Sequence, residues 1–424
     1  MTGSTLRLVV VSIAAACLLP ARVAAQQYEG RTIAAVTVTG LGHIKEAVVL
    51  EQIESRPGQP YRQAVVDLDL IRLDRLGVFS DVTMTPVEVG DALHVNIVVA
   101  ETLRVLPAVS IAVTDENGTS IGPAVKFLSV RGHPQEMSLT ARFGGSTLFE
   151  FSETSAELTH SPFFHSGKAA FRERYNKLDE FNERSIDLEA RAGVRVSERF
   201  KTGAIVQFYQ VRSDESGITL SSDNVDALVS AGAVADHDSR NSRQDTSNGW
   251  WNSADALWRM GTGGYATMDI DVRRYQRLAS RHVLVATSLL TLQSGSPDVV
   301  ASYSDFSLGG SNTVRGWGFN ARRGKNQFVN SLEYRYTVLE TRAFRVVGLG
   351  LYAGLALAVF GDAGSAWNES GDFSSGGIGG GGIGLRLFLP FVNMIRLDFA
   401  LGDGNAHAHL GINEKSVAQR NRVR

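Results

Sequence analysis

The sequence predicts a mainly β protein, an antiparallel transmembrane β-barrel of about 16 strands preceded by one small α/β domain of order β-α-α-β-β. Three observations predict it. The chain begins with an export signal, residues 103–424 contain many segments of alternating polar and apolar residues, and residues 28–102 have a helical periodicity that the rest lacks. Barrel strands alternate because one face meets lipid and the other meets the lumen.

Residues 1–25 are predicted to be a secretory signal peptide. Arg7 precedes the apolar run 8–19, which is too short to span a bilayer, and small residues precede the expected cut after Ala25. A lipoprotein box ending at Cys17 is the alternative, although the apolar run continues past this cysteine. With a cut after Ala25 the mature chain has no cysteine, which excludes disulfides, thiolate metal sites and thiol nucleophiles.

Composition narrows the class of protein further. A net charge of −2 gives no reason to expect nucleic-acid binding. Hydrophobic residues make up 43% of the chain, which suits a barrel because a barrel needs apolar residues only at every second position. A match to the nucleophile pattern G-x-S-x-G occurs at residues 118–122, but such a short pattern is weak evidence by itself, and we expect no enzyme activity and no cofactor.

Residues 28–102 are predicted to form the small α/β domain. The expected elements are a strand, two helices and two strands, over residues 33–40, 44–54, 63–76, 78–85 and 93–99. Val66, Leu70 and Leu73 share one face of the second helix, and Gly77 is placed to end it. A generic α+β domain is the alternative.

Residues 103–424 are predicted to form the barrel, with a basic tail over 413–424 that is most simply a solvated terminus. The uncharged stretch 346–361 tests for a membrane helix, but its large and small side chains alternate, which indicates a strand. Tryptophans at segment ends suit an interfacial girdle. At roughly 20 residues per strand and loop, the region holds about 16 strands.

Two motifs carry a resemblance to a known family. The stretch 73–82 is similar to the turn between the second helix and second strand of a polypeptide-transport-associated (POTRA) domain, with Leu73, Gly77, Phe79 and Val82 as its motif residues. Val314-Arg315-Gly316-Trp317 resembles the V-R-G-[FYW] tetrapeptide in the sixth extracellular loop of the BamA/TamA family of outer-membrane assembly proteins. Further similarities lie at residues 238–241, 330–335, 360–367 and 382–386.

The resemblance implies that this loop folds back into the barrel lumen and is held there. Alternation places Glu333 and Asp362 on lumen-facing positions of the strands near the loop. We predict that Arg315 forms a bidentate ion pair with Asp362, Glu333 or both, because guanidinium forks suit carboxylates. The same arrangement holds the loop in the family. The alternative is that Arg315 is a solvated loop residue.

Weaker patterns favour structural interpretations. Residues 377–382 satisfy G-x-G-x-x-G, but the following segment is strand-like, so the glycines are expected to permit strand bending or close approach of the lumenal loop. His407 and His409 share a strand face, but no third metal ligand is evident, and we expect lumenal polar residues.

The resemblance implies insertion, assembly or translocation of other proteins at the bacterial outer membrane, with the POTRA domain in the periplasm. The implied partners are the lipid bilayer, unfolded barrel or secreted clients that bind the POTRA edge strand and the barrel seam, and a periplasmic or inner-membrane protein. Two departures from the family are the single POTRA domain and a final strand without a terminal aromatic residue. A dedicated two-partner secretion pore and a passive pore or structural surface protein are the alternatives.

Overall fold

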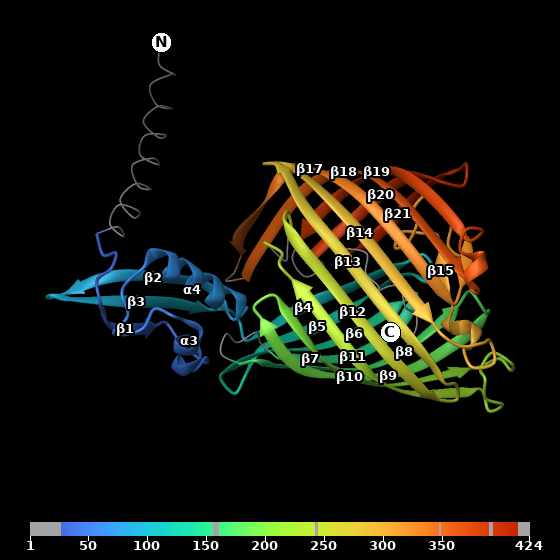
Figure 1. Ribbon diagram of the computed structural model, residues 1–424, viewed down its shortest axis with the longest axis horizontal. Coiled ribbons are helices and arrows are strands. Elements are labelled where there is room, and N and C mark those ends of the chain that lie inside the picture. The colour runs from blue at the N-terminus through green and yellow to red at the C-terminus, as the bar shows by residue number, and fades with distance from the viewer. Residues whose placement is uncertain (1–26, 156–160, 242–244, 347–348, 390–392, 414–424) are drawn as a thin grey trace, which may run out of the picture. The chain divides into compact units, whose positions relative to one another are not determined.

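A computed structural model describes residues 27–155, 161–241, 245–346, 349–389 and 393–413 (Figure 1). The expected signal peptide and residues 414–424 of the expected basic tail lie outside the described residues. The chain folds into two compact units, an N-terminal α/β unit and a large β unit.

The α/β unit has the predicted order of elements. They are β1 (Ile33–Thr39), α3 (Glu46–Gln52), α4 (Gln63–Arg75), β2 (Phe79–Val89) and β3 (Ala92–Glu101). The strands lie in the order β1-β3-β2, with β1 parallel and β2 antiparallel to β3. Helix α3 is shorter than expected because Ile53 already has extended backbone angles.

An apolar core holds this unit together. Val95 and Ile97 of β3 are fully buried, together with Val49 of α3 and Leu73 of α4. Such burial contributes roughly 1.5–3 kcal/mol for each large apolar side chain. The core of this unit is therefore that of a water-soluble domain.

The POTRA motif residues lie where α4 gives way to β2. Leu73 is a core residue, Phe79 is buried at the start of β2, and Val82 packs against the same core. Gly77 follows the helix with φ +69°, a left-handed conformation that favours glycine at a helix end. The motif therefore sets both the end of the helix and the entry to the strand.

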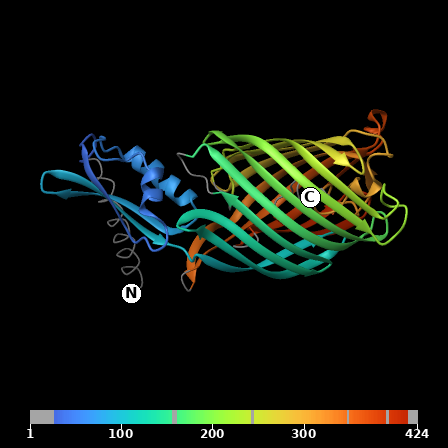
Figure 2. The ribbon, with the colours of Figure 1, turned by 90° about the horizontal axis from the view of Figure 1, so that it is seen from below.

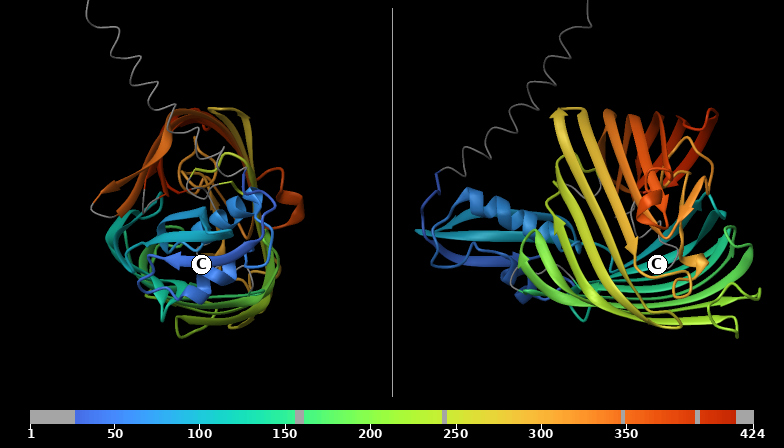
Figure 3. Two further views of the ribbon diagram at one scale, coloured as in Figure 1. Left: turned by 90° about the vertical axis from the view of Figure 1, so that its left-hand side faces the viewer. Right: turned by 45° about the vertical axis from the view of Figure 1, so that its right-hand side comes forward.

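The second unit is a 16-stranded sheet whose strands follow one another in chain order (Figures 1 and 2). Its strands are β4 (Val105–Thr114), β5 (Gly118–Val130), β6 (His133–Gly144), β7 (Ser146–Ser155), β8 (Phe163–Asn176), β9 (Phe181–Ser197), β10 (Phe200–Ser213), β11 (Val225–Asp238), β12 (Gly249–Gly261), β13 (Tyr265–Ala279), β14 (His282–Gln293), β17 (Asn326–Val346), β18 (Leu349–Trp367), β19 (Gly377–Leu389), β20 (Asn393–Leu401) and β21 (Ala406–Ile412). Seen end-on, the sheet curls into a ring (Figure 3). The predicted barrel fold and its strand number are confirmed.

The two faces of the barrel wall differ in polarity as the alternation predicts. On β18, Ala356 and Ala358 are 2% and 3% exposed, whereas Leu357 and Val359 are 47% and 57% exposed. The uncharged stretch is therefore a strand with its large residues on the outside, where lipid would cover them. Among the described residues, no helix is both long and apolar enough to cross a bilayer.

The barrel has one seam, between its first strand β4 and its last strand β21. The two strands are the ends of the hydrogen-bonded order of the sheet, yet they lie close to each other. In the part of the chain that the structure describes, no backbone ladder joins them, whereas β10 and β11 pair continuously from Phe200 to Arg212. The sheet is thus nearly closed.

Candidate functional site

The long connection between β14 and β17 packs inside the barrel. It includes a short hairpin of β15 (Phe306–Leu308) and β16 (Arg322–Gly324). Leu308, Val314 and Arg315 each have an exposed fraction of 0%. Surface loops do not bury side chains this fully, so the connection lies against the lumenal wall.

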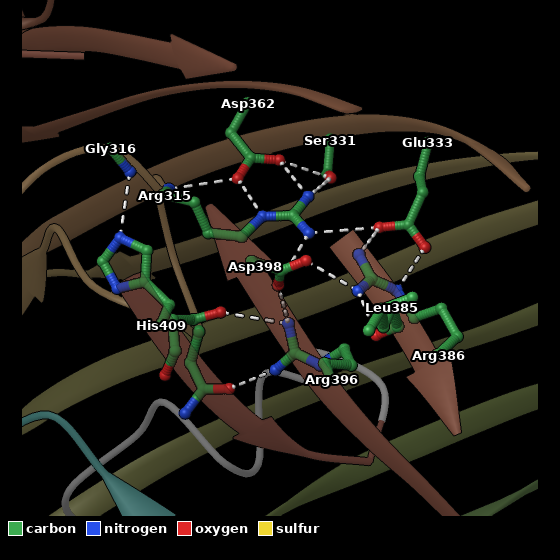
Figure 4. A network of polar contacts seen from close by, with 12 residues as sticks. Arg315, Gly316, Ser331, Glu333, Asp362, Leu385, Arg386, Arg396, Asp398 and His409 are labelled. Atoms are coloured by element: carbon green, nitrogen blue, oxygen red, sulfur yellow. Dashed lines mark hydrogen bonds and ion pairs between the residues drawn. The ribbon is translucent and has the colours of Figure 1, made fainter. Parts of the chain in front are cut away.

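Arg315 reaches the carboxylates that the sequence places on the lumenal face (Figure 4). Its Nε and Nη2 donate to the two oxygens of Asp362 at 2.7 and 2.9 Å, and its backbone N–H donates to Asp362 Oδ2 at 3.1 Å. Its Nη1 donates to Glu333 Oε2 at 3.1 Å. Asp362 is the bidentate partner and Glu333 the single one, so the structure brings all three residues together.

The network extends beyond the residues singled out in the sequence. Asp398 of β20 is a third carboxylate that accepts a hydrogen bond from Arg315, at 3.2 Å, and it accepts another from Arg386 of β19 at 2.6 Å. Arg386 also forms a pair of bonds with Glu333, to which Arg335 donates at 2.7 Å. Alternation places these residues on lumen-facing positions of their strands. Which of them pair across strands depends on the strand register, and the sequence does not give that register.

Burial makes this network sensitive to the loss of any member. Arg315 and Arg386 are 0% exposed, and Asp398 is 2% exposed. A charge held in such a site must be paired, since removing one partner of a buried pair leaves the other uncompensated and costs about 3–5 kcal/mol. Through Arg315 the network connects the loop directly to β17, β18 and β20, and Arg386 of β19 links Glu333 to Asp398.

Val314 and Gly316 flank the arginine and support its position differently. Val314 packs in a small apolar cluster with Leu308 of the loop and Val329 of β17. Gly316 has φ +89°, and a Cβ at this position would lie 2.5 Å from the backbone of Leu401. Glycine is therefore required here for both conformation and space.

Trp317 and the glycine-rich start of β19 face each other. The Trp317 Nε1–H donates to the carbonyl oxygen of Gly379 at 2.8 Å. A Cβ on Gly380 would lie 2.1 Å from the carbonyl oxygen of Arg315. The G-x-G-x-x-G segment thus lies in a strand and allows the loop to approach the wall.

The loop has a second charged attachment. Arg323 of β16 donates to Asp179, in the turn between β8 and β9, at 2.8 Å, and to Asp305 of the loop itself at 2.9 Å. The sequence analysis did not find this pair, since nothing in the alternation links residues 144 positions apart.

His407 and His409 occupy one face of β21 with stacked rings, 5.8 Å between centroids. Their polar contacts differ, because His407 is paired with Asp403 at 2.9 Å whereas His409 accepts a hydrogen bond from the backbone of Gly316. Within the described ranges, no group of three or more His, Cys, Asp and Glu side chains is arranged to hold a metal ion.

Comparison with protein families agrees with this architecture. Residues 130–415, more than half of the chain, match the model of the Omp85 superfamily domain. This chain belongs to the Omp85 superfamily. Residues 31–102 match the POTRA model, described as a surface antigen variable number repeat. A comparison with curated proteins gives no match.

Three solved structures share the fold at low identity. BamA from Haemophilus ducreyi lacking POTRA domains 1-3 has a TM-score of 0.62 and 14% identity, over 90% of this chain and 83% of that chain. CdiB from Escherichia coli has a TM-score of 0.57 and 12% identity, over 91% and 75%. CdiB from Acinetobacter baumannii has a TM-score of 0.51 and 12% identity, over 91% and 72%.

The resemblance found in the sequence is confirmed at the level of the superfamily. The chain is an outer-membrane barrel with a periplasmic POTRA domain. Because β4 leaves the periplasmic domain and neighbouring strands alternate in direction, the connection after β14, the eleventh strand of the sheet, lies at the extracellular end.

Proposed function

We propose that this protein assists the insertion or assembly of other β-barrel proteins at the outer membrane. The observation that supports this most is the seam. Strands β4 and β21 have no ladder between them in the described residues, so their edges carry backbone groups that an incoming strand can pair with. An extended client adds to such an edge by main-chain hydrogen bonds, and lipid favours complete pairing of the backbone.

The α/β unit suits the same function. Its outer strands, β1 and β2, are edges of a three-stranded sheet and can each accept one further strand. We propose unfolded barrel proteins as clients and a periplasmic or inner-membrane protein as a partner. The proposal requires no catalytic group, metal or cofactor.

We also propose that the tetrapeptide 314–317, Glu333 and Asp362 lock the loop to the lumen. If so, Arg315→Ala removes the guanidinium that bonds twice to Asp362 and once each to Glu333 and Asp398, and so loosens the loop. We expect the loop to become sensitive to protease in folded protein and the heat-dependent gel shift to move to lower temperature. Unchanged protease resistance and an unchanged shift would contradict the lock.

The second candidate function is export of one dedicated partner protein, which the similarity to CdiB favours. Liposomes containing the purified full chain distinguish the two. We expect a urea-unfolded barrel client to fold several-fold faster in them than in empty liposomes, as measured by gel mobility without boiling. Equal folding rates would refute the insertion proposal, and ion conductance without accelerated folding would favour a pore.

A further inference from the structure

The loop that Arg315 anchors also contacts both sides of the seam. On one side, Asp115 is the first residue after β4. Its Oδ2 accepts hydrogen bonds from the backbone N–H of Ser311 at 2.9 Å and from the Ser311 hydroxyl at 2.7 Å. A Cβ on Gly310 would lie 2.6 Å from the same oxygen, so the loop approaches Asp115 as closely as glycine allows.

The other side of the seam is β21 and its neighbour β20. His409 of β21 is 6% exposed, and its Nε2 accepts the backbone N–H of Gly316 at 3.1 Å (Figure 4). Arg396 of β20 donates to the carbonyl oxygen of Ser311 at 3.1 Å and to that of Asn413, directly after β21, at 2.8 Å. The loop is therefore bonded to the last two strands as well.

The two sides also meet directly. His409 Nδ1 lies 3.8 Å from Asp115 Oδ1, and because Nε2 accepts from Gly316, the neutral ring carries its proton on Nδ1, toward this carboxylate. Burial alone would raise the pKa of Asp115, but its interactions with His409 and Ser311 outweigh burial and lower the pKa below its usual value. Asp115 therefore remains a carboxylate at neutral pH and can accept charge-assisted hydrogen bonds.

We propose that residues 311–316 form a seam clasp, with Asp115 and His409 as its positioning residues, that holds β4 against β21 in place of a backbone ladder. The clasp regulates access to the seam and so rests on the proposed function. Arg315 attaches the loop to β17, β18 and β20, whereas Asp115 attaches it to β4. Loss of Asp115 therefore frees β4 while the loop remains anchored.

Spin labels on the two strands test the clasp without any client. Val109 of β4 and Leu410 of β21 are outward-facing, with exposed fractions of 50% and 39%. Cys17, in the expected signal peptide, is the only cysteine of the chain, so Val109→Cys and Leu410→Cys provide unique labelling sites in the mature protein. The distance between the nitroxides is measured in liposomes by pulsed electron spin resonance.

We expect one narrow distance distribution in the parent protein. Asp115→Ala should add a population longer by roughly 5 Å or more, one strand spacing. His407→Ala is the matched control, because this histidine lies on the same strand but pairs with Asp403 rather than the loop. A distribution that Asp115→Ala leaves unchanged, in protein whose heat-dependent gel shift shows a folded barrel, would overturn the clasp.

A covalent clasp separates this proposal from the proposed function. Asp115→Cys with Ser311→Cys places two thiols where a 2.7 Å hydrogen bond stood, and oxidation joins β4 to the loop. We expect the oxidised chain to lose the acceleration of client folding and reductant to restore it. If oxidation has no effect although Asp115→Ala separates the labels, the clasp stands and the seam is not the client site.

Discussion

The two units of this chain differ in the kind of large side chain that they bury most completely. In the POTRA unit, the fully buried side chains include Val49, Leu73 and Val95. In the barrel, the largest fully buried side chains are arginines, among them Arg259, Arg273 and Arg386, whereas many leucines and valines of the strands point outward. The difference shows that burial pattern follows the solvent, because hydrocarbon surrounds the barrel and water surrounds the POTRA unit.

Different interactions therefore stabilise the two units. Removing apolar surface from water stabilises the POTRA unit, since its core is made of aliphatic side chains. The barrel gains nothing of that kind on its lipid face, and its interior combines small apolar clusters with buried charges that pair with one another. Substitutions in the lumenal network and in the POTRA core test this contrast.

Arg386→Leu is expected to have the largest effect, because it makes the lumen resemble the POTRA core. Glu333 and Asp398 each lose a partner while buried, and the folded barrel should lose about 3–5 kcal/mol. Urea titration of the protein in vesicles, followed by gel mobility without boiling, measures the loss. Arg199→Leu, at an exposed arginine between β9 and β10, is the control and should cost far less. Equal losses would show that the lumenal network contributes nothing special.

Leu73→Ala tests the apolar core of the POTRA unit. Leu73 is 0% exposed, so the change leaves a cavity and should cost about 2–5 kcal/mol locally. Hydrogen exchange of the full chain, read by mass spectrometry, should accelerate in residues 28–102 and remain unchanged in the barrel strands. Leu68→Ala on the same helix is the control, because Leu68 is 50% exposed. Similar acceleration in both variants would contradict an apolar core as the main source of stability.

Much of this contrast was predictable from the sequence, because alternation depends only on neighbouring residues. The faces of β18 follow from its large and small residues, and Glu333 and Asp362 were placed on the lumenal face for the same reason. Arg315 was paired with them because it is the one arginine of the family tetrapeptide. In the structure it bonds to both carboxylates.

The contacts at the seam were not predictable, since they depend on how the sheet closes. Ser311 and Asp115 are 196 residues apart, and only the ring of strands brings them together. His409 and His407 have equivalent positions in the alternation, yet only His409 contacts the loop. Which histidine contacts the loop depends on where along β21 the loop passes, and no local sequence pattern encodes that position.

Glu101 gives the smallest expected effect. In the POTRA unit, as in the barrel, this carboxylate holds a loop by accepting hydrogen bonds. Glu101 ends β3 and accepts the backbone N–H groups of Gly42, His43 and Ile44 at 2.8–2.9 Å. Burial alone would raise the pKa of Glu101, but these hydrogen bonds outweigh it and lower the pKa below the ordinary 4.5. The folded state therefore holds the charged form more tightly than the unfolded state does.

A lowered pKa gives stability that is present above pH 4.5 and lost as the pH falls through the folded value. Because the side chain is only partly buried, the contribution should stay below about 1 kcal/mol. Glu101→Gln should therefore accelerate amide exchange at residues 42–44 at pH 6 and flatten the pH dependence of their protection between pH 6 and 3. Glu88→Gln, at an exposed glutamate of β2, should do neither. If Glu101→Gln leaves that pH dependence intact, the carboxylate of Glu101 contributes nothing to the stability of the POTRA unit.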